Sequence, residues 1–127
     1  MHIYFLDDDR TRTRRFISKV PCAVCVEKAS EMIQLLNRQT EPIQSLFLDH
    51  DLGGEIFVSS AREDCGMEVV RWLCKNAQKK SKQIEQIIIH SHNHPAAEEM
   101  FNALQQHGFK VARIPFSQMI ERIDYIP

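Results

Sequence analysis

The chain has 127 residues, 43% of them hydrophobic, which suits one domain with a single sizeable core, so we expect residues 1–127 to form one domain. Its 16 basic and 17 acidic residues nearly cancel, which excludes an extended basic surface for nucleic acid. The apolar runs are far shorter than the roughly 20 residues that span a bilayer, and the chain opens into an acidic turn instead of a signal peptide. We therefore expect a cytoplasmic protein that does not contact membranes.

The hydrophobic period switches repeatedly along the chain between short apolar runs, typical of buried strands, and the helical pattern of i, i+3, i+4 and i+7. In chain order this predicts a strand at 2–6, a helix at 11–20, a strand at 22–26, a helix around Ser30 that Pro42 ends, a strand at 45–48, a helix after Asp64, a solvated connection at 78–82, a strand at 84–89, a helix at 95–107 that Gly108 closes, a strand at 110–114 and a helix from Ser117 through Ile123.

Strands that alternate with helices in this way predict a three-layer, doubly wound (βα)5 domain with a parallel sheet. Two strand orders are common for such folds, the flavodoxin-like order 2-1-3-4-5 and a Rossmann-like alternative. Polar clusters follow three of the strands, at residues 7–10, 49–51 and 90–93. Only the flavodoxin-like order makes these three strands neighbours, so the clusters favour that order.

The acidic residues at two of these strand ends predict a metal site. Five aspartates on neighbouring strand ends repel one another unless a cation lies among them, and we assign Asp7, Asp8, Asp49 and Asp51 as ligands of a divalent ion. Carboxylates alone suit Mg²⁺ or Mn²⁺, whereas added imidazoles make Zn²⁺ possible. The alternative is that two of the aspartates, Asp9 and Asp51, only cap turns or helices.

Histidines at the same strand ends predict acid–base chemistry, because imidazole titrates near neutral pH. His50, His90 and His92 are candidates for acid, base or additional metal ligand, and Asp49 completes the predicted catalytic set. A histidine such as His90, which follows three isoleucines, is also often a hydrogen-bonded core residue.

Three residues are predicted to bind a phosphate group. Arg10 can clamp it, while Ser91 and Asn93 can hold it next to the start of the helix at residue 95. The alternatives are that Arg10 pairs only with Asp8 or Asp9 and that Asn93 caps the helix.

These residues carry a resemblance to a known pattern. Asp7 and Asp8 after the first strand, Asp49 after the third, Ser91 after the fourth and Gly66 opening a helix resemble the receiver domains of response regulators. The resemblance implies an acidic pair that holds Mg²⁺ and a third-strand aspartate that accepts a phosphoryl group. The fifth strand departs from it, because Ile114 stands where receivers have a lysine.

A closer resemblance covers most of the chain. The segments Leu48-Asp-His-Asp-Leu-Gly53, Gly66-Met-Glu-Val-Val-Arg-Trp-Leu73 and Ile88-Ile-His-Ser-His-Asn93 resemble the cyclic-phosphate-processing receiver-like family. This resemblance implies a receiver fold that acts on cyclic phosphate esters. A cyclic mononucleotide, a cyclic oligonucleotide and a 2′,3′-cyclic RNA end share that group, so all three remain open as ligands.

Three functional classes follow. The histidines favour a metal-dependent phosphoesterase, a hydrolase that opens a cyclic phosphate. A divergent receiver with Asp49 as phospho-acceptor and a non-catalytic phosphate-binding or nucleotide-binding module are the alternatives. The partner is in each case a phosphate-bearing ligand, and the sequence leaves the oligomeric state open.

Two further features concern the cysteines and one long segment. Cys22 and Cys25 have a metal-like spacing, but on a strand they point to opposite faces, so we expect all four cysteines to be reduced and mostly buried. Residues 53–64 are longer than an ordinary strand-to-helix turn, which indicates a lid over the site. Gly53-Gly54 would be its hinge, Ile56-Phe57-Val58 its apolar centre and Arg62 a phosphate contact, and a plain surface loop is the alternative.

Overall fold

The computed structural model describes residues 2–52, 54–55 and 57–123. Its strands are β1 (Ile3–Leu6), β2 (Val24–Val26), β3 (Ser45–Leu48), β4 (Ile87–Ile89) and β5 (Val111–Arg113). They form one sheet in the order β2-β1-β3-β4-β5, and every neighbouring pair is parallel. The predicted strand order is therefore confirmed.

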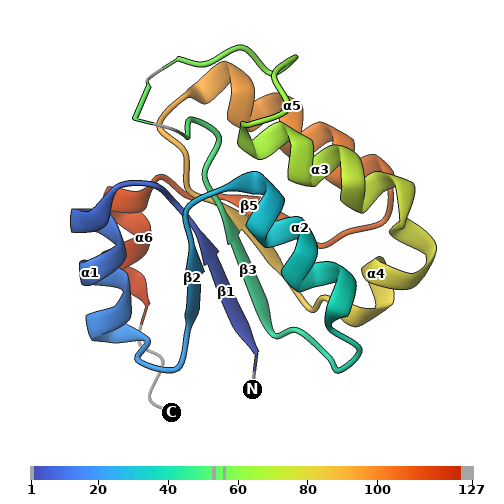
Figure 1. The fold of residues 1–127 in the computed structure, drawn as a ribbon, viewed down its shortest axis with the longest axis horizontal. Helices are drawn as coiled ribbons and strands as arrows, with labels where there is room; N and C mark the ends of the chain where they lie inside the picture. Colours follow the sequence, from blue (N-terminus) through green and yellow to red (C-terminus); the bar gives the residue numbers. More distant parts are fainter. Residues whose placement is uncertain (1, 53, 56, 124–127) are drawn as a thin grey trace.

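Helices cover both faces of the sheet (Figure 1). On one face lie α1 (Arg10–Lys19) and α6 (Phe116–Arg122), and on the other lie α2 (Ala29–Arg38), α3 (Gly66–Lys75) and α5 (His94–Gln106), with α4 (Ala77–Gln83) following α3. Successive strand residues face opposite sides, so Tyr4 and Leu6 enter the core under α2, α3 and α5, whereas Ile3 and Phe5 enter the core under α1 and α6.

The segment predicted as a solvated connection at 78–82 is instead helical, which corrects that prediction. The reason lies in Lys80, which is only 6% exposed and donates from Nζ to the carbonyl oxygens of Leu36 at 2.6 Å and Gln39 at 3.2 Å. These carbonyls belong to the end of α2, which has no further turn to satisfy them. One lysine of the basic run therefore closes a neighbouring helix, while Lys79 and Lys82 remain exposed.

The cysteines are all free, as expected, but their burial differs from the prediction. Only Cys65 is buried, Cys25 and Cys74 are half-buried, and Cys22 is exposed because β2 begins after it, at Val24. Among the helices of the described residues, none combines the length and apolar character needed to cross a membrane.

Candidate functional site

Strand register places three polar side chains side by side at the carboxyl edge of the sheet. Phe5 of β1 is paired with Phe47 of β3, and Phe47 is paired with Ile88 of β4. Two residues further along each strand stand Asp7, Asp49 and His90, and the period of two directs all three to the face covered by α1 and α6. One ligand atom from each of the three lies within 4.8 Å of the others.

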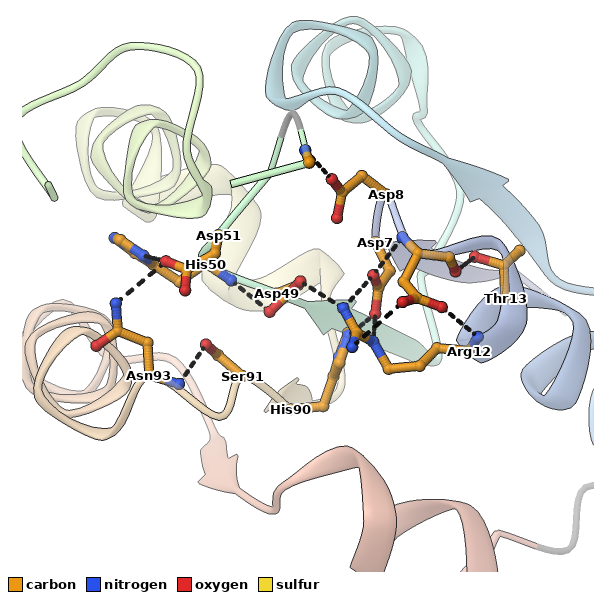
Figure 2. A network of polar contacts seen from close by, with 12 residues as sticks. Asp7, Asp8, Arg12, Thr13, Asp49, His50, Asp51, His90, Ser91 and Asn93 are labelled. Carbon is orange, nitrogen blue, oxygen red and sulfur yellow. Dashed lines mark hydrogen bonds and ion pairs between the residues drawn. The ribbon is translucent and has the colours of Figure 1, made fainter. Parts of the chain in front are cut away.

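Asp7 is the centre of this buried network (Figure 2). Its carboxylate accepts from Arg12 Nε at 2.8 Å and Arg12 Nη2 at 2.9 Å, from the backbone N–H of Asp9 at 2.9 Å, and it lies 3.0 Å from Nε2 of His90. His90 is fully buried and its ring is stacked on Phe5, with 4.8 Å between the centroids. His90 is therefore both a core residue and part of the polar cluster.

The pKa values of the two buried carboxyl groups, Asp7 and Asp49, are shifted in opposite directions. Burial raises the pKa of Asp7, but the hydrogen bonds from His90 and Arg12 outweigh it and lower that pKa to about 2. Burial also raises the pKa of Asp49, and the nearby Asp7 charge adds to this, so that the pKa reaches about 6 despite His90 and Arg12. Asp49 is consequently the carboxyl group of the pair that takes up a proton first.

The arginine that contacts the buried carboxylates is Arg12, whereas Arg10, which was predicted to bind phosphate, is not in the cavity lining. Asp9 is the N-cap of α1 and accepts from the backbone N–H of Arg12 at 2.9 Å, which sets the helical phase. Arg12 then points to Asp7 and, at 3.5 Å, to Asp49, whereas Arg10 lies on the surface 3.9 Å from Glu27. The ion pair with Asp7 raises the pKa of Arg12, so its charge is permanent.

The three strand-end histidines go to different places. His50 is one residue out of phase with Asp49, so it faces the α3 side, where Nδ1 lies 2.7 Å from Asp51 and Nε2 lies 3.0 Å from Ser60. Burial lowers the pKa of His50, but the contacts with the Cys65 thiol and with Asp51 raise it by more, so the pKa lies above its ordinary value. His92 is exposed and borders the cavity described below. Burial and then the Arg12 charge lower the pKa of His92.

Two predicted metal ligands, Asp8 and Asp51, bind backbone N–H groups instead of joining the cluster. Asp8 accepts from the N–H of Gly54. Asp51 accepts from the N–H groups of Phe57 at 2.7 Å and Val58 at 3.1 Å, which is the turn-capping role considered as the alternative for it. Neither carboxylate belongs to the metal-competent group found among the described residues.

The two predicted phosphate-binding residues on the loop after β4 differ in what they can still offer. Asn93 is the N-cap of α5: its Oδ1 accepts from the N–H of Ala96 at 3.3 Å and its Nδ2 donates to Asp51 at 3.1 Å. Ser91 accepts the N–H of Asn93 at 3.1 Å, which leaves its hydroxyl proton able to donate to a ligand.

These strand ends enclose a cavity of about 320 Å³. Its lining includes Arg12, Asp49, Ser91 and His92, and the remaining lining comes from Asp8, Asp9, Asp51, Gly54, Glu55, Phe57 and Asn93. Close packing of the start of α3 against the end of β3 helps to hold Asp49 in position. A Cβ atom on Gly66 would stand 1.9 Å from the carbonyl oxygen of Asp49, so only glycine allows the start of α3 to lie there.

Residues 1–106 match the family model described as "Cyclic-phosphate processing Receiver domain". The chain belongs to this family. No curated protein matches this receiver-like chain.

Two solved structures have similar folds. A sensor protein from Polaromonas sp. JS666 has 17% sequence identity to this chain and a TM-score of 0.64. The alignment covers 94% of this chain and 90% of the sensor protein chain. The signal receiver domain of a Luxo repressor protein from Vibrio parahaemolyticus has 17% identity and a TM-score of 0.59, covering 93% of this chain and 82% of its own. At this identity the likeness establishes the receiver fold alone.

The donor set of this receiver-like site suits a divalent ion, although the guanidinium group of Arg12 competes with an ion for the carboxylates. Asp7, Asp49 and His90 offer two carboxylates and an imidazole, a set that fits Mn²⁺ or Zn²⁺ better than Mg²⁺. Arg12 already supplies a positive charge to both carboxylates. An ion bound here would share Asp7 with the guanidinium group.

The long segment after β3 falls partly outside the described residues, because Gly53 and Ile56 of the predicted hinge and apolar centre are not among them. Of the remainder, Gly54 and Phe57 border the cavity and Val58 is buried. Arg62 pairs with Glu55 and Asp64 and is not in the cavity lining.

Arg12 was not predicted from the sequence as a site residue. The signal that could have placed it was Asp9, which stands just before a helical pattern and caps α1.

Proposed function

We propose that this receiver-like chain is a metal-dependent phosphoesterase that opens a cyclic phosphate in the cavity at the carboxyl ends of β1, β3 and β4. The observation that carries the proposal is that permanent positive charge, a hydroxyl donor and an imidazole border one cavity in a chain of this family. These groups are Arg12, Ser91 and His92. They are the parts that charge neutralisation, orientation and proton transfer require.

In the proposed reaction the phosphate lies between Arg12 and Ser91. A water molecule attacks phosphorus while one ester P–O bond breaks, so the ring opens to a phosphomonoester and an alcohol. His92 accepts the proton of the attacking water and returns a proton to the leaving alkoxide. Its lowered pKa suits the first of these roles, because the imidazole is neutral at pH 7.

The acidic cluster would contribute to this reaction by holding a divalent ion. Asp7, Asp49 and His90 would hold Mn²⁺ or Zn²⁺, or Mg²⁺ through the carboxylates, and the bound ion would supply further charge neutralisation and water activation. His50 is not in the cavity lining and contributes indirectly, because it holds Asp51, which in turn fixes the loop after β3 through the N–H of Phe57.

The test is a panel of cyclic phosphate esters incubated with Mg²⁺, Mn²⁺ or Zn²⁺, with ring opening followed by phosphorus NMR. His92→Ala should bind the best ester but lose turnover by about 100-fold, the lower range for removal of a general base. The matched control is His94→Ala, because His94 is also exposed but borders a separate hollow beside Arg113. Absence of ring opening with every ester and ion would refute the proposal.

A second candidate is a divergent receiver that is phosphorylated on Asp49. The observation in its favour is the position of Asp49 at the end of β3, bordering the cavity, in a receiver fold. Incubation with a small phosphodonor such as acetyl phosphate should then label the wild type and not Asp49→Asn, as measured by intact-protein mass. Labelling without ester hydrolysis would favour this candidate.

A further inference from the structure

An exposed aromatic ring stands at the edge of the otherwise polar cavity. Phe57 is 72% exposed, the most of the large hydrophobic residues in the described part of the chain. Among the described residues that line the cavity it has the only apolar side chain. A large apolar surface left in water costs free energy unless something covers it.

The backbone of Phe57 is also held in an unusual conformation. Its φ is 52°, in the left-handed region that bulky side chains rarely adopt. Such a conformation persists when the surroundings determine it, and it is common at ligand-binding positions. The left-handed backbone at Phe57 therefore belongs to the conformation in which its ring is exposed.

Site carboxylates hold this segment in place. Asp51 accepts from the N–H groups of Phe57 at 2.7 Å and Val58 at 3.1 Å, and Asp51 is itself held by His50 and Asn93. Val58 is only 8% exposed and anchors the segment to the body of the domain. The same loop that follows the Asp49 cluster thus fixes the ring at the edge of the cavity.

We propose that Phe57 is a stacking platform for a nucleobase, and that the ligand class is a nucleoside cyclic phosphate. This inference rests on the proposed function, which places the cyclic phosphate between Arg12 and Ser91. The cavity of about 320 Å³ is at the small end of the roughly 300–1,000 Å³ typical of small-molecule sites, so it accommodates one nucleotide unit. A base is the part of such a ligand that has an apolar face to cover Phe57.

The test compares two ligands that differ only in the base. Adenosine 2′,3′-cyclic phosphate and methyl riboside 2′,3′-cyclic phosphate are titrated calorimetrically into the wild type, and the 3′,5′ pair is titrated in parallel. The wild type should bind the nucleotide about tenfold more tightly than the base-free ester, as expected for one base stacked on an aromatic ring.

Phe57→Ala should abolish this preference by weakening the nucleotide alone, whereas Phe57→Trp should keep it. Ile17→Ala is the matched control, because Ile17 is an exposed apolar residue on α1, 40% exposed and outside the cavity lining. Equal affinity of the wild type for both esters, or equal weakening of both by Phe57→Ala, overturns the inference while the proposed function stands. Failure of the wild type to bind either pair overturns both.

Discussion

Replacing Asp49 by asparagine should stabilise the protein at neutral pH. Oδ1 of Asp49 accepts the N–H of His50 at 2.9 Å, a bond that an amide oxygen can keep, and the contact of Oδ2 with Arg12 is long at 3.5 Å. The substitution therefore removes a buried negative charge at little geometric cost.

The magnitude follows from the pKa of Asp49, which burial and the Asp7 charge raise from 3.8 to about 6. Between these values the folded protein holds a proton that the unfolded chain has lost, so stability falls as pH rises through this window. At roughly 1.36 kcal/mol for each pKa unit, the ionised carboxylate costs about 3 kcal/mol above pH 6. Asp49→Asn should recover most of this.

The assay is urea unfolding with a chelator present, at steps from pH 4 to pH 7.5. The gain from Asp49→Asn should be largest at pH 7.5 and shrink towards zero near pH 4. Asp7→Asn is the matched comparison: hydrogen bonds from His90 and Arg12 overcome burial and lower the pKa of Asp7 to about 2, so its ionised form stabilises the fold. Asp7→Asn should cost roughly 2 kcal/mol at pH 7.5. A loss of stability in Asp49→Asn, or a gain independent of pH, would refute the reasoning.

Three other predictions concern the metal, α3 and α4. Mn²⁺ should raise the melting temperature of the wild type and not of Asp49→Asn, since only the folded cluster binds it; identical melting with Mn²⁺ and with chelator contradicts this. Gly66→Ala should cost about 1–3 kcal/mol in urea unfolding, because the new Cβ meets the Asp49 carbonyl, and normal stability would exclude that contact. Lys80→Met should cost about 2 kcal/mol by the same assay and Lys79→Met, at an exposed position, almost nothing; equal losses would show that the α2 carbonyls do not depend on Lys80.

The strand order was predictable because it follows from which strand ends carry polar residues. The period of two within a strand also predicts that Asp49 and His50 face opposite sides of the sheet, because neighbouring residues on a strand point to opposite faces. Assigning His50, His90 and His92 to one site left this period unused. Of the three, only His90 is in phase with Asp7 and Asp49, and His50 lies on the other face beside Ser60.

Arg12 and Lys80 were harder to foresee, because a basic residue on a helix is ordinarily solvated. Arg12 enters the site because Asp9 caps the start of α1 and so sets which side of the helix faces the site. Lys80 is buried because the end of α2 lies against α4, a tertiary contact that cannot be read from the local sequence. In both cases the decisive partner comes from the assembled fold.

The roles of Asp8 and Asp51 explain why carboxylates could be located at the site but not assigned. An aspartate at a strand end can ligate a metal or cap a turn, and what decides is whether backbone N–H groups reach it. Here the loop after β3 brings those groups to both residues, so charge that would otherwise bind an ion holds Phe57 at the cavity. Because Val58 is buried and the carbonyl of Ser60 accepts from Arg71, deleting the whole segment would disturb α3 as well. The function of this loop therefore has to be tested at the ring of Phe57, where the side chain can change while the anchors remain.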